Sequence, residues 1–398
     1  MDIHNYKRRL EKTVENIQNS DISAENKKLI FKFRDNCFTE GLSISKIDRY
    51  LYDVHKFAKM VNKYLLDASR DDLKAIVAQI EQKEWSPHSK HGFKVMIRKF
   101  YKSIEGPDEK GVYPERVKWL HSTVKQSSEK TPSELVSETD IKQMIAHAGN
   151  ARDRALIAVL YESGCRISEV GLMKIKDVSF DQYGAIINVA GKTGARRVRL
   201  VTSGPYLQEW INHHEFNYDP NNYVWIQRSN GKILSYARFA SIIKRNALAV
   251  GIKKRIYPHL FRHSRATFLA SKLTEAQMKQ YLGWTQSSKM AAVYVHLSGR
   301  DTDNAILNLN GIKIQKEEET REELKPKTCI RCNKIHPATT KFCNQCGLIL
   351  DDIEARKFIQ VEMEKSQFEE YLSKVLGNKE IVSKLLEKME EEINQKLK

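Results

Sequence analysis

The segment P-H-L-F-R-H-S-R-A-T, residues 258–267, combines an imidazole and a guanidinium at a spacing that suits an anion. Pro258 favours the first turn of a helix, and His259 and Arg262 then share one helical face at positions i and i+3. An imidazole beside a guanidinium can hold one phosphate group. A basic helix face that follows a phosphate backbone, without taking part in any reaction, explains the same residues.

A second arginine with a nearby carboxylate occurs in E-S-G-C-R-I-S-E-V, residues 162–170. Arg166 follows a Gly-Cys turn and precedes a predicted helix. Glu169 comes three residues later, where its carboxylate can hold the Arg166 guanidinium in place. Taken alone, this segment is explained at least as well by an exposed arginine–glutamate pair on a helix.

A basic turn lies between these two segments. Lys192 occupies the tip G-K-T-G of a predicted hairpin, from which a lysine can reach into a groove and donate a proton. Most turn lysines are simply solvated, so Lys192 alone is a weak signal. Arg196, Arg197 and Arg199 follow it, and we interpret them as facing a polyanion.

The segment L-G-W-T-Q-S-S-K-M-A-A-V-Y-V-H-L, residues 282–297, adds an indole N–H donor at Trp284 and a phenol at Tyr294. An aromatic residue on a helix belongs to the core far more often than to a catalytic site. The case for chemistry therefore depends on the four segments together and not on any one of them.

The joint order Arg, Lys, His-x-x-Arg, Trp, Tyr resembles the tyrosine recombinase (phage integrase) family over roughly residues 20 to 310. S-G-C-R-I-S-E resembles the first family box, and H-L-F-R-H resembles the second. The segment from Leu282 to Asp301 looks most like integrases of archaea and their viruses. Trp284 stands where most members of the family carry histidine, and the spacing from Trp284 to Tyr294 is one residue longer than in common bacterial relatives.

The resemblance implies a reaction at a DNA phosphodiester. Tyr294 would attack the phosphorus in line and leave a 3′-phosphotyrosine link with a free 5′ hydroxyl. Arg166 and Arg262 would clamp the two charged non-bridging oxygens. The covalent link conserves the energy of the broken bond, so neither ATP nor a catalytic cofactor is required.

The resemblance also implies roles for the remaining residues and for partners. Lys192 would protonate the departing 5′ oxygen, and His259 would act as a general base or hydrogen-bond partner. Trp284 would donate its N–H to a non-bridging oxygen. Family members work as four protomers on two duplexes, so the expected partners are double-stranded DNA at specific sites and a homotetramer on that DNA.

The elements that would position these residues are mainly α-helical, with a small antiparallel β hairpin (α+β). Between residues 44 and 61, apolar residues recur at three- and four-residue steps. Ser69 with Asp72 fits a capping box, and Ser86 with Pro87 fits a helix start. After residue 137 we expect helices at 138–148, 151–163, 167–174, 205–213, 235–250, 258–271, 274–282 and 286–297, and a hairpin at 184–201.

This pattern predicts several domains, as 398 residues also suggest. The expected divisions are a helical core-binding (SAM-like) DNA-clamp domain at 1–121, a linker at 122–137, a tyrosine recombinase catalytic domain at 138–312, a charged linker at 313–327, a zinc ribbon at 328–352 and a helical tail at 353–398.

Four cysteines in paired spacing indicate the ribbon. Cys329-x-x-Cys332 and Cys343-x-x-Cys346 are separated by ten residues, which is the spacing of a four-thiolate structural Zn²⁺ site. We expect His336, between the two pairs, to lie at the surface and not to bind the metal.

The tail carries an apolar stripe that runs from Phe368 to Ile393 and is interrupted at Gly377-Asn378. This stripe fits packing against a partner protomer, packing against its own chain, or a plain stabilising helix. The sequence does not choose among the three.

Charge and hydropathy limit the class of protein. The net charge of +17 indicates a polyanionic partner, because neutralising phosphates releases their counterions. The chain begins with a polar segment, and no apolar run approaches the ~20 residues that span a bilayer. We therefore predict a cytoplasmic protein with no membrane partner. Cys37 and Cys165 stand alone and are expected in the core.

Two other functions fit the same residues. A type IB topoisomerase shares much of this catalytic set and would relax DNA without a defined site. A DNA-binding regulator would keep the fold without the chemistry, although such a protein has no need of the tyrosine. Formation of a covalent DNA adduct separates the enzymes from the regulator.

Overall fold

The computed structural model describes residues 2–106, 111–121, 134–191, 193–295, 306–307, 309–310, 324–377, 382–384 and 386–388. The chain folds into two compact units. The first contains Met1–Leu135 together with Ile233–Phe239, and the second contains Val136–Lys232 together with Ala240–Lys398. Most of the predicted linker, residues 122–133, lies outside the described residues.

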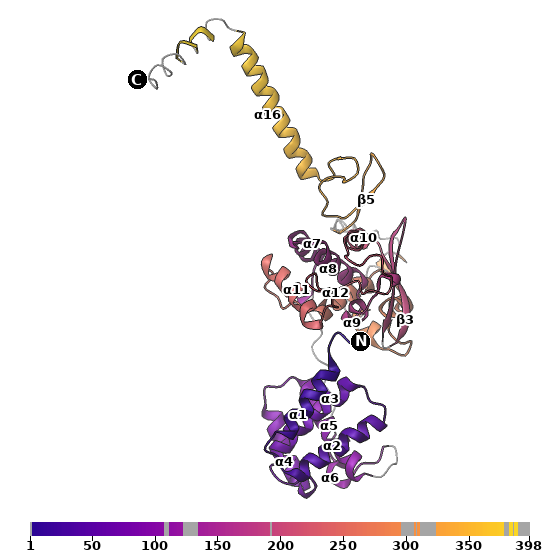
Figure 1. The fold of residues 1–398 in the computed structure, drawn as a ribbon. Helices are drawn as coiled ribbons and strands as arrows, with labels where there is room; N and C mark the ends of the chain where they lie inside the picture. Colours follow the sequence, from indigo (N-terminus) through magenta and orange to yellow (C-terminus); the bar gives the residue numbers. More distant parts are fainter. Residues whose placement is uncertain are drawn as a thin grey trace, which may run out of the picture. The chain divides into compact units, whose positions relative to one another are not determined.

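The first unit is a helical bundle, as predicted. The apolar face of its third helix buries Ile47, Leu51 and Val54, while Ile44 at the start of that helix is 40% exposed. The Ser69–Asp72 capping box and the Ser86 N-cap are both present. Its helices are α1 (Tyr6–Gln18), α2 (Ala24–Thr39), α3 (Ile44–Val61), α4 (Arg70–Gln82), α5 (Pro87–Glu105) and α6 (Glu115–Lys118), with a 3₁₀ turn η1 at Leu65–Asp67 (Figure 1).

The second unit contains a three-stranded antiparallel sheet in the order β1-β2-β3. Strands β2 (Gly184–Gly191) and β3 (Gly194–Leu200) form the predicted hairpin, which closes with Gly191 opposite Gly194. Strand β1 (Val178–Asp181) pairs with β2 and was not predicted. Its four residues are too few and too exposed to give an alternating pattern.

Helices surround a central buried helix in this unit. Every residue of α8 from Ala155 to Ser163 is buried, so α8 lies at the centre of these helices. The helices are α7 (Glu138–His147), α8 (Ala151–Ser163), α9 (Ile167–Gly171), α10 (Gly204–Asn212), α11 (Tyr236–Ala249), α12 (Pro258–Ala270), α13 (Glu275–Leu282) and α14 (Met290–Val295), with a 3₁₀ turn η3 at Ile175–Asp177.

Two predicted helices extend at least three residues beyond an end that the structure shows. Helix α9 ends at Gly171 and not at residue 174, because the Met173 carbonyl instead accepts a hydrogen bond from the Val224 N–H at 2.9 Å. Helix α14 begins at Met290 and not at residue 286. The Ser288 hydroxyl accepts the Met290 N–H at 3.2 Å, which starts the helix there.

The ribbon and the tail follow. Strands β4 (Lys327–Thr328) and β5 (Ile335–His336) pair in antiparallel fashion. Helix α16 spans Asp352–Leu376 and ends before Gly377, where the sequence predicted a break. Residues 382–384 and 386–388 are also helical. Among the described residues, no helix is both long enough and apolar enough to cross a membrane.

Candidate active site

Five of the six predicted catalytic residues line one cavity of about 280 Å³ in the second unit. The sixth, Lys192, lies outside the described residues. Its neighbour Thr193 does line the cavity and donates its hydroxyl to the Gly283 carbonyl at 2.9 Å. The tip of the hairpin is therefore part of this site. The predicted residues that line the cavity are Arg166, His259, Arg262, Trp284 and Tyr294.

Arg262 is held rigidly at the inner wall. It is 4% exposed and donates two hydrogen bonds, to the Gly164 carbonyl at 2.9 Å and to the Leu282 carbonyl at 2.7 Å. The Trp284 ring centre lies 5.4 Å from its guanidinium carbon. Burial, and after it the positive charge of Arg166, lower the pKa of Arg262 to about 10. The guanidinium has N–H donors to spare, and no carboxylate among the described residues forms an ion pair with it, so the site favours an anion.

Gly164 supplies one of these carbonyls from a left-handed turn. Its φ is +56°, which follows the end of α8, and an added Cβ would lie 2.9 Å from a Leu282 methyl carbon. Glycine is therefore needed here both for the turn and for the close approach of α13.

Arg166 is held by Glu169, as the sequence predicted. The two side chains form a hydrogen-bonded ion pair of 2.8 Å, and the Arg166 backbone N–H donates to the same carboxylate at 2.9 Å. Glu169 is 2% exposed, whereas the Arg166 side chain is 31% exposed and faces the cavity. The buried carboxylate thus orients an arginine that remains accessible.

Glu169 has a second partner, which corrects the sequence analysis. Arg196 was expected to face a polyanion, but its side chain is 10% exposed and donates to the Glu169 carboxylate at 2.8 Å. Burial alone would raise the pKa of Glu169. The hydrogen bonds from Arg196 and from the Arg166 backbone outweigh burial and hold this pKa below its ordinary value. Of the three arginines, Arg197 is exposed, and Arg199 pairs with Asp181.

The hairpin approaches this carboxylate closely. A Cβ on Gly191 would lie 2.3 Å from the Glu169 carboxylate oxygen, a distance that no side chain tolerates. The glycine before Lys192 therefore allows the tip of the hairpin to pack against the Arg166–Glu169 pair.

Tyr294 reaches the cavity from α14 and is 5% exposed. Its phenolic oxygen lies 2.6 Å from Nδ1 of His263, and its ring stacks on Trp284 with centres 5.7 Å apart. Burial raises the pKa of Tyr294, and the nearby charge of Arg262 opposes this only in part. The phenol is therefore protonated at neutral pH and needs a proton acceptor before it can attack.

His263 is the site residue that the sequence analysis missed. It lies four residues after His259 on α12, and the two rings contact edge to face at 4.7 Å. The signal was present in H-L-F-R-H, because helical spacing puts residues four apart on one face. The partner of the phenol could not be assigned from the sequence, because that contact joins α12 to α14.

The four cysteines of the ribbon come together as predicted. Their sulfur atoms all lie within 4.8 Å of one another. A tetrahedral zinc site with Zn–S bonds of about 2.3 Å has sulfur–sulfur distances of about 3.8 Å. The cluster therefore fits a four-thiolate metal site, formed by Cys329, Cys332, Cys343 and Cys346.

The two cysteine pairs lie on turns of the same construction. In each turn the N–H of the first cysteine donates to the carbonyl five residues later, that of Lys334 or Leu348. In each, the residue after the second cysteine has a positive φ: Asn333 at +55° and Gly347 at +74°. Such paired turns are expected of a closed structural site and not of a catalytic one.

His336 was expected at the surface, and that expectation is wrong. The side chain is 2% exposed, and its Nε2 is buried without a hydrogen-bond partner among the described residues. It faces inward because β5 pairs with β4, which places His336 opposite Lys327.

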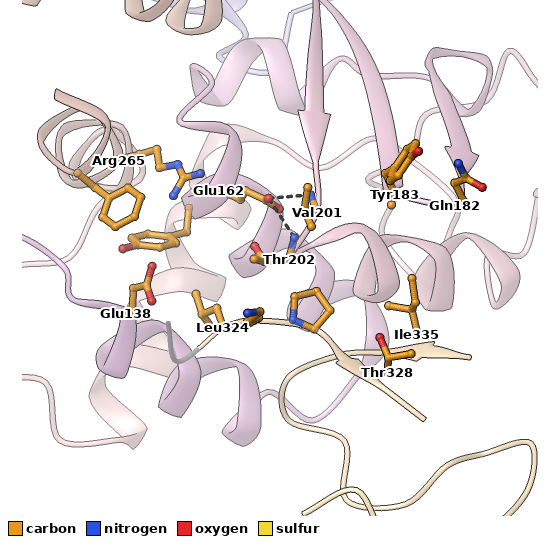
Figure 2. Close-up of a pocket in the computed structure, with 15 residues that line it drawn as sticks. Glu138, Glu162, Gln182, Tyr183, Val201, Thr202, Arg265, Leu324, Thr328 and Ile335 are labelled. Atoms are coloured by element: carbon orange, nitrogen blue, oxygen red, sulfur yellow. Dashed lines mark hydrogen bonds between the residues drawn. The ribbon is translucent and has the colours of Figure 1, made fainter. Parts of the chain in front are cut away.

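A second cavity, of about 590 Å³, lies between residues 324–335 and the helices and sheet of the second unit. Figure 2 shows Leu324 and Ile335 lining this cavity and the Glu162 carboxylate accepting the Val201 and Thr202 N–H groups, at 2.7 and 3.0 Å. None of the predicted catalytic residues lines this cavity. Glu162 here fixes the end of β3, which is a structural task.

The ribbon is also tied to α10. The Tyr206 hydroxyl lies 2.9 Å from the Thr339 hydroxyl, and it accepts the Thr339 N–H at 3.2 Å. These contacts dock the ribbon on α10, and Leu324, just before the ribbon, is 5% exposed.

The part of the chain that carries this cavity is similar to known proteins. Residues 134–300 match the phage integrase family. The tyrosine recombinase XerA of Pyrococcus furiosus is 26% identical over 275 residues, which cover 68% of this chain and 90% of that protein. The tyrosine recombinase XerD of Yersinia pestis is 25% identical over 293 residues, which cover 68% of this chain and 93% of that protein.

Solved structures show the same fold. The XerH site-specific recombinase bound to a palindromic difH substrate is similar with a TM-score of 0.55 and 17% identity, covering 77% of this chain and 95% of that one. A lambda integrase dimer bound to a COC′ core site is similar with a TM-score of 0.53 and 14% identity, covering 69% and 77%. Residues 134–300, which carry the arginines, the histidine and the tyrosine of the cavity, are thus similar in sequence to the phage integrase family.

Proposed function

We propose that this protein is a site-specific DNA recombinase that cleaves and rejoins DNA strands through a 3′-phosphotyrosine link at Tyr294. One observation carries the proposal: the phenol of Tyr294 opens onto the same 280 Å³ cavity as Arg166 and Arg262. A structural tyrosine has no reason to share a cavity with two arginines. A site for transferring a phosphodiester needs this combination.

The two arginines bind the non-bridging oxygens of the phosphate that is attacked. Arg262 provides a fixed, buried charge, and Arg166 provides an accessible one oriented by Glu169. Charge on these oxygens grows in the pentavalent transition state, so donors fixed in advance stabilise that state more than the ground state. Trp284 packs against both Arg262 and Tyr294, and we assign its indole N–H to one of the same oxygens.

The phenolic oxygen of Tyr294 forms the new bond to phosphorus as the bond to the 5′ oxygen breaks. Its proton passes to an imidazole. His263 contacts this oxygen, and His259 contacts His263 and lines the cavity, so the two rings can share the task. The departing 5′ oxygen takes a proton from Lys192, which the sequence places between Gly191 and Thr193 at the tip of the hairpin. A 5′ hydroxyl then reverses these steps to rejoin a strand.

The partners follow from this chemistry. The substrate is double-stranded DNA at specific sites, and the positive net charge of +17 suits it. We propose that residues 1–121 act as the DNA-clamp domain and residues 138–312 as the catalytic domain. Exchange between two duplexes requires four active tyrosines, hence a homotetramer on DNA. Because its substrate is cellular DNA, we propose that the protein acts in the cytoplasm. The four-cysteine cluster would hold a structural Zn²⁺ that fixes the ribbon.

The Tyr294→Phe variant tests the proposal on a nicked DNA duplex that traps the covalent intermediate. The unchanged protein should form an adduct that survives denaturing electrophoresis, and the variant should form none while binding the DNA with the same affinity. Tyr281→Phe, which removes a hydroxyl from a nearby tyrosine whose partners are backbone carbonyls, should still form the adduct. An adduct with Tyr294→Phe would disprove the nucleophile. Relaxation of supercoiled DNA with no defined site would indicate a topoisomerase instead.

A further inference from the structure

Arg196 occupies a position that the fold would suit to an apolar residue. It alternates along β3 with Val198 and Leu200, which are both fully buried, and it lies opposite the buried Val189 of β2. Its own side chain is 10% exposed. Because well-packed apolar side chains are usually as stable as a buried ion pair, stability alone does not account for an arginine here.

The Arg196 guanidinium joins β3 to two other segments beside the cavity. Its Nη1 and Nη2 donate to the two Glu169 carboxylate oxygens at 3.1 and 2.8 Å, and Nη2 also donates to the Cys165 sulfur at 3.3 Å. Its Nε donates to the Tyr281 carbonyl at 2.9 Å. A Cβ on Gly283 would lie 2.4 Å from Nη1 of Arg196, so the segment that follows α13 packs directly on this guanidinium.

The charges around Glu169 add up in favour of an anion. Arg166 and Arg196 each contribute one positive charge and Glu169 one negative charge, so the three groups together carry +1. Without Arg196, the pair of Arg166 and Glu169 would be neutral. The field of Arg196 extends to the inner wall of the cavity. After burial and the charge of Arg166, it is a further cause of the lowered pKa of Arg262.

Arg196 does not line the cavity, so it can act on a bound phosphate only through its neighbours. We propose that Arg196 is a positioning residue for the phosphate site: it neutralises Glu169, so that Glu169 orients Arg166 without cancelling the charge that Arg166 offers to the DNA phosphate. This inference rests on the proposed function and adds to it a residue that never touches the substrate. The harm done by losing Arg196 then comes from the uncompensated carboxylate.

Substitutions at position 196 separate charge from packing and from hydrogen bonding. Arg196→Met fills the apolar position, and it should slow adduct formation on a nicked duplex roughly 30-fold in single-turnover measurements. Arg196→Gln keeps hydrogen bonding without the charge and should be about as slow. Arg196→Lys keeps the charge with fewer hydrogen bonds and should lose less than about fivefold.

A second substitution tests the role of the carboxylate directly. Combining Arg196→Met with Glu169→Gln removes one charge of each sign and restores the net charge of +1. Although this double variant has lost a second buried partner, it should form the adduct roughly tenfold faster than Arg196→Met alone. A purely structural role for Arg196 predicts the opposite, because the double variant is then the more damaged of the two.

The chain offers a matched control in Arg152→Met. The Arg152 side chain is 12% exposed and shares the buried Asp153 carboxylate with Arg245, as Arg196 shares Glu169 with Arg166. None of these three control residues lines the cavity. Arg152→Met should therefore keep the rate of the unchanged protein at a temperature where thermal unfolding shows all variants to be folded.

Three results overturn the inference while the unchanged protein remains active: an unaffected Arg196→Met, a double variant no faster than Arg196→Met, or an equal slowing by Arg152→Met. If Arg196→Met does not fold, the same comparison is made between Arg196→Lys and Arg196→Gln, and equal rates for these two overturn it. An unchanged protein that forms no adduct at all would instead overturn the proposed function, and this inference with it.

Discussion

The phenolic oxygen of Tyr294 lies 2.6 Å from Nδ1 of His263, although helical spacing in the sequence drew attention to His259. His263→Phe keeps a ring of similar size but removes the proton acceptor. We expect adduct formation at neutral pH to slow about 100-fold, because a protonated phenol attacks poorly. Single-turnover rates on a nicked duplex measure this effect.

The pH profile distinguishes proton transfer from mere packing. Burial raises the pKa of Tyr294, so the variant should recover as rising pH ionises the phenol without help. His147→Phe, at an exposed position on α7, serves as the control and should leave the rate unchanged. If the His263 variant kept the original rate and pH profile of adduct formation, the contact between His263 and Tyr294 would have no part in the reaction.

Arg262 should be irreplaceable even by lysine. Arg262→Ala and Arg166→Ala should each slow adduct formation by about 100- to 1000-fold, the usual effect of losing one donor to a transition-state oxygen. Arg262→Lys keeps a charge but cannot bond the Gly164 and Leu282 carbonyls and the phosphate together, so it should rescue little.

An arginine outside the site serves as the control in the same rate measurement. Arg154→Ala breaks a pair with Glu209 that does not line the cavity, and its rate should match that of the unchanged protein. Full activity in either Arg166→Ala or Arg262→Ala would show that this arginine does not stabilise the phosphate in the transition state.

Glu169→Gln should destabilise the second unit by about 3 kcal/mol at neutral pH, because it leaves two arginines without their buried counter-charge. The folded-state pKa of Glu169 lies below its ordinary value of 4.5. Its contribution to stability is therefore fully present above that value, and it is lost as pH falls through the folded-state pKa.

Thermal unfolding of the full chain at several pH values measures this difference. The difference in free energy of unfolding between Glu169→Gln and the unchanged protein should be large at neutral pH and should become smaller in acid. Glu209→Gln, which breaks a more exposed pair, should cost less than about 1 kcal/mol. If the loss of stability in Glu169→Gln did not change with pH, Glu169 would not act as an ionised partner of the two arginines.

Removal of the metal should loosen the ribbon and spare the chemistry. The purified chain should bind one Zn²⁺, measured with a chromogenic chelator, and Cys343→Ser should bind none, because the site requires four thiolates. None of the four cysteines lines the cavity at Tyr294, so the adduct on nicked DNA should still form.

Proteolysis reports the docking of the ribbon. Without metal, cleavage near Thr339 should become faster, because the contacts with Tyr206 depend on a folded ribbon. Cys37→Ala, in the helical bundle, should keep both the metal and the protection. Full protection in a metal-free chain would show that the ribbon folds without the ion.

The sequence by itself determined what depends on neighbours along the chain. Arg166 with Glu169, and His259 with Arg262, are spaced by helical geometry, and the paired cysteines are spaced by two tight turns. Each pattern operates within about one or two helical turns, where backbone periodicity fixes which side chains meet. Together with the resemblance of their joint order to the tyrosine recombinases, these signals named five of the residues that line the cavity.

Tertiary structure alone decided the contacts between distant segments. Arg196 turns inward because a buried carboxylate at Glu169, on another element, attracts it, whereas its neighbour Arg197 stays exposed. The partner of Tyr294 is set by the packing of α14 against α12, 31 residues earlier in the chain. Periodicity cannot predict such pairs, because their geometry depends on how whole helices and strands pack in three dimensions.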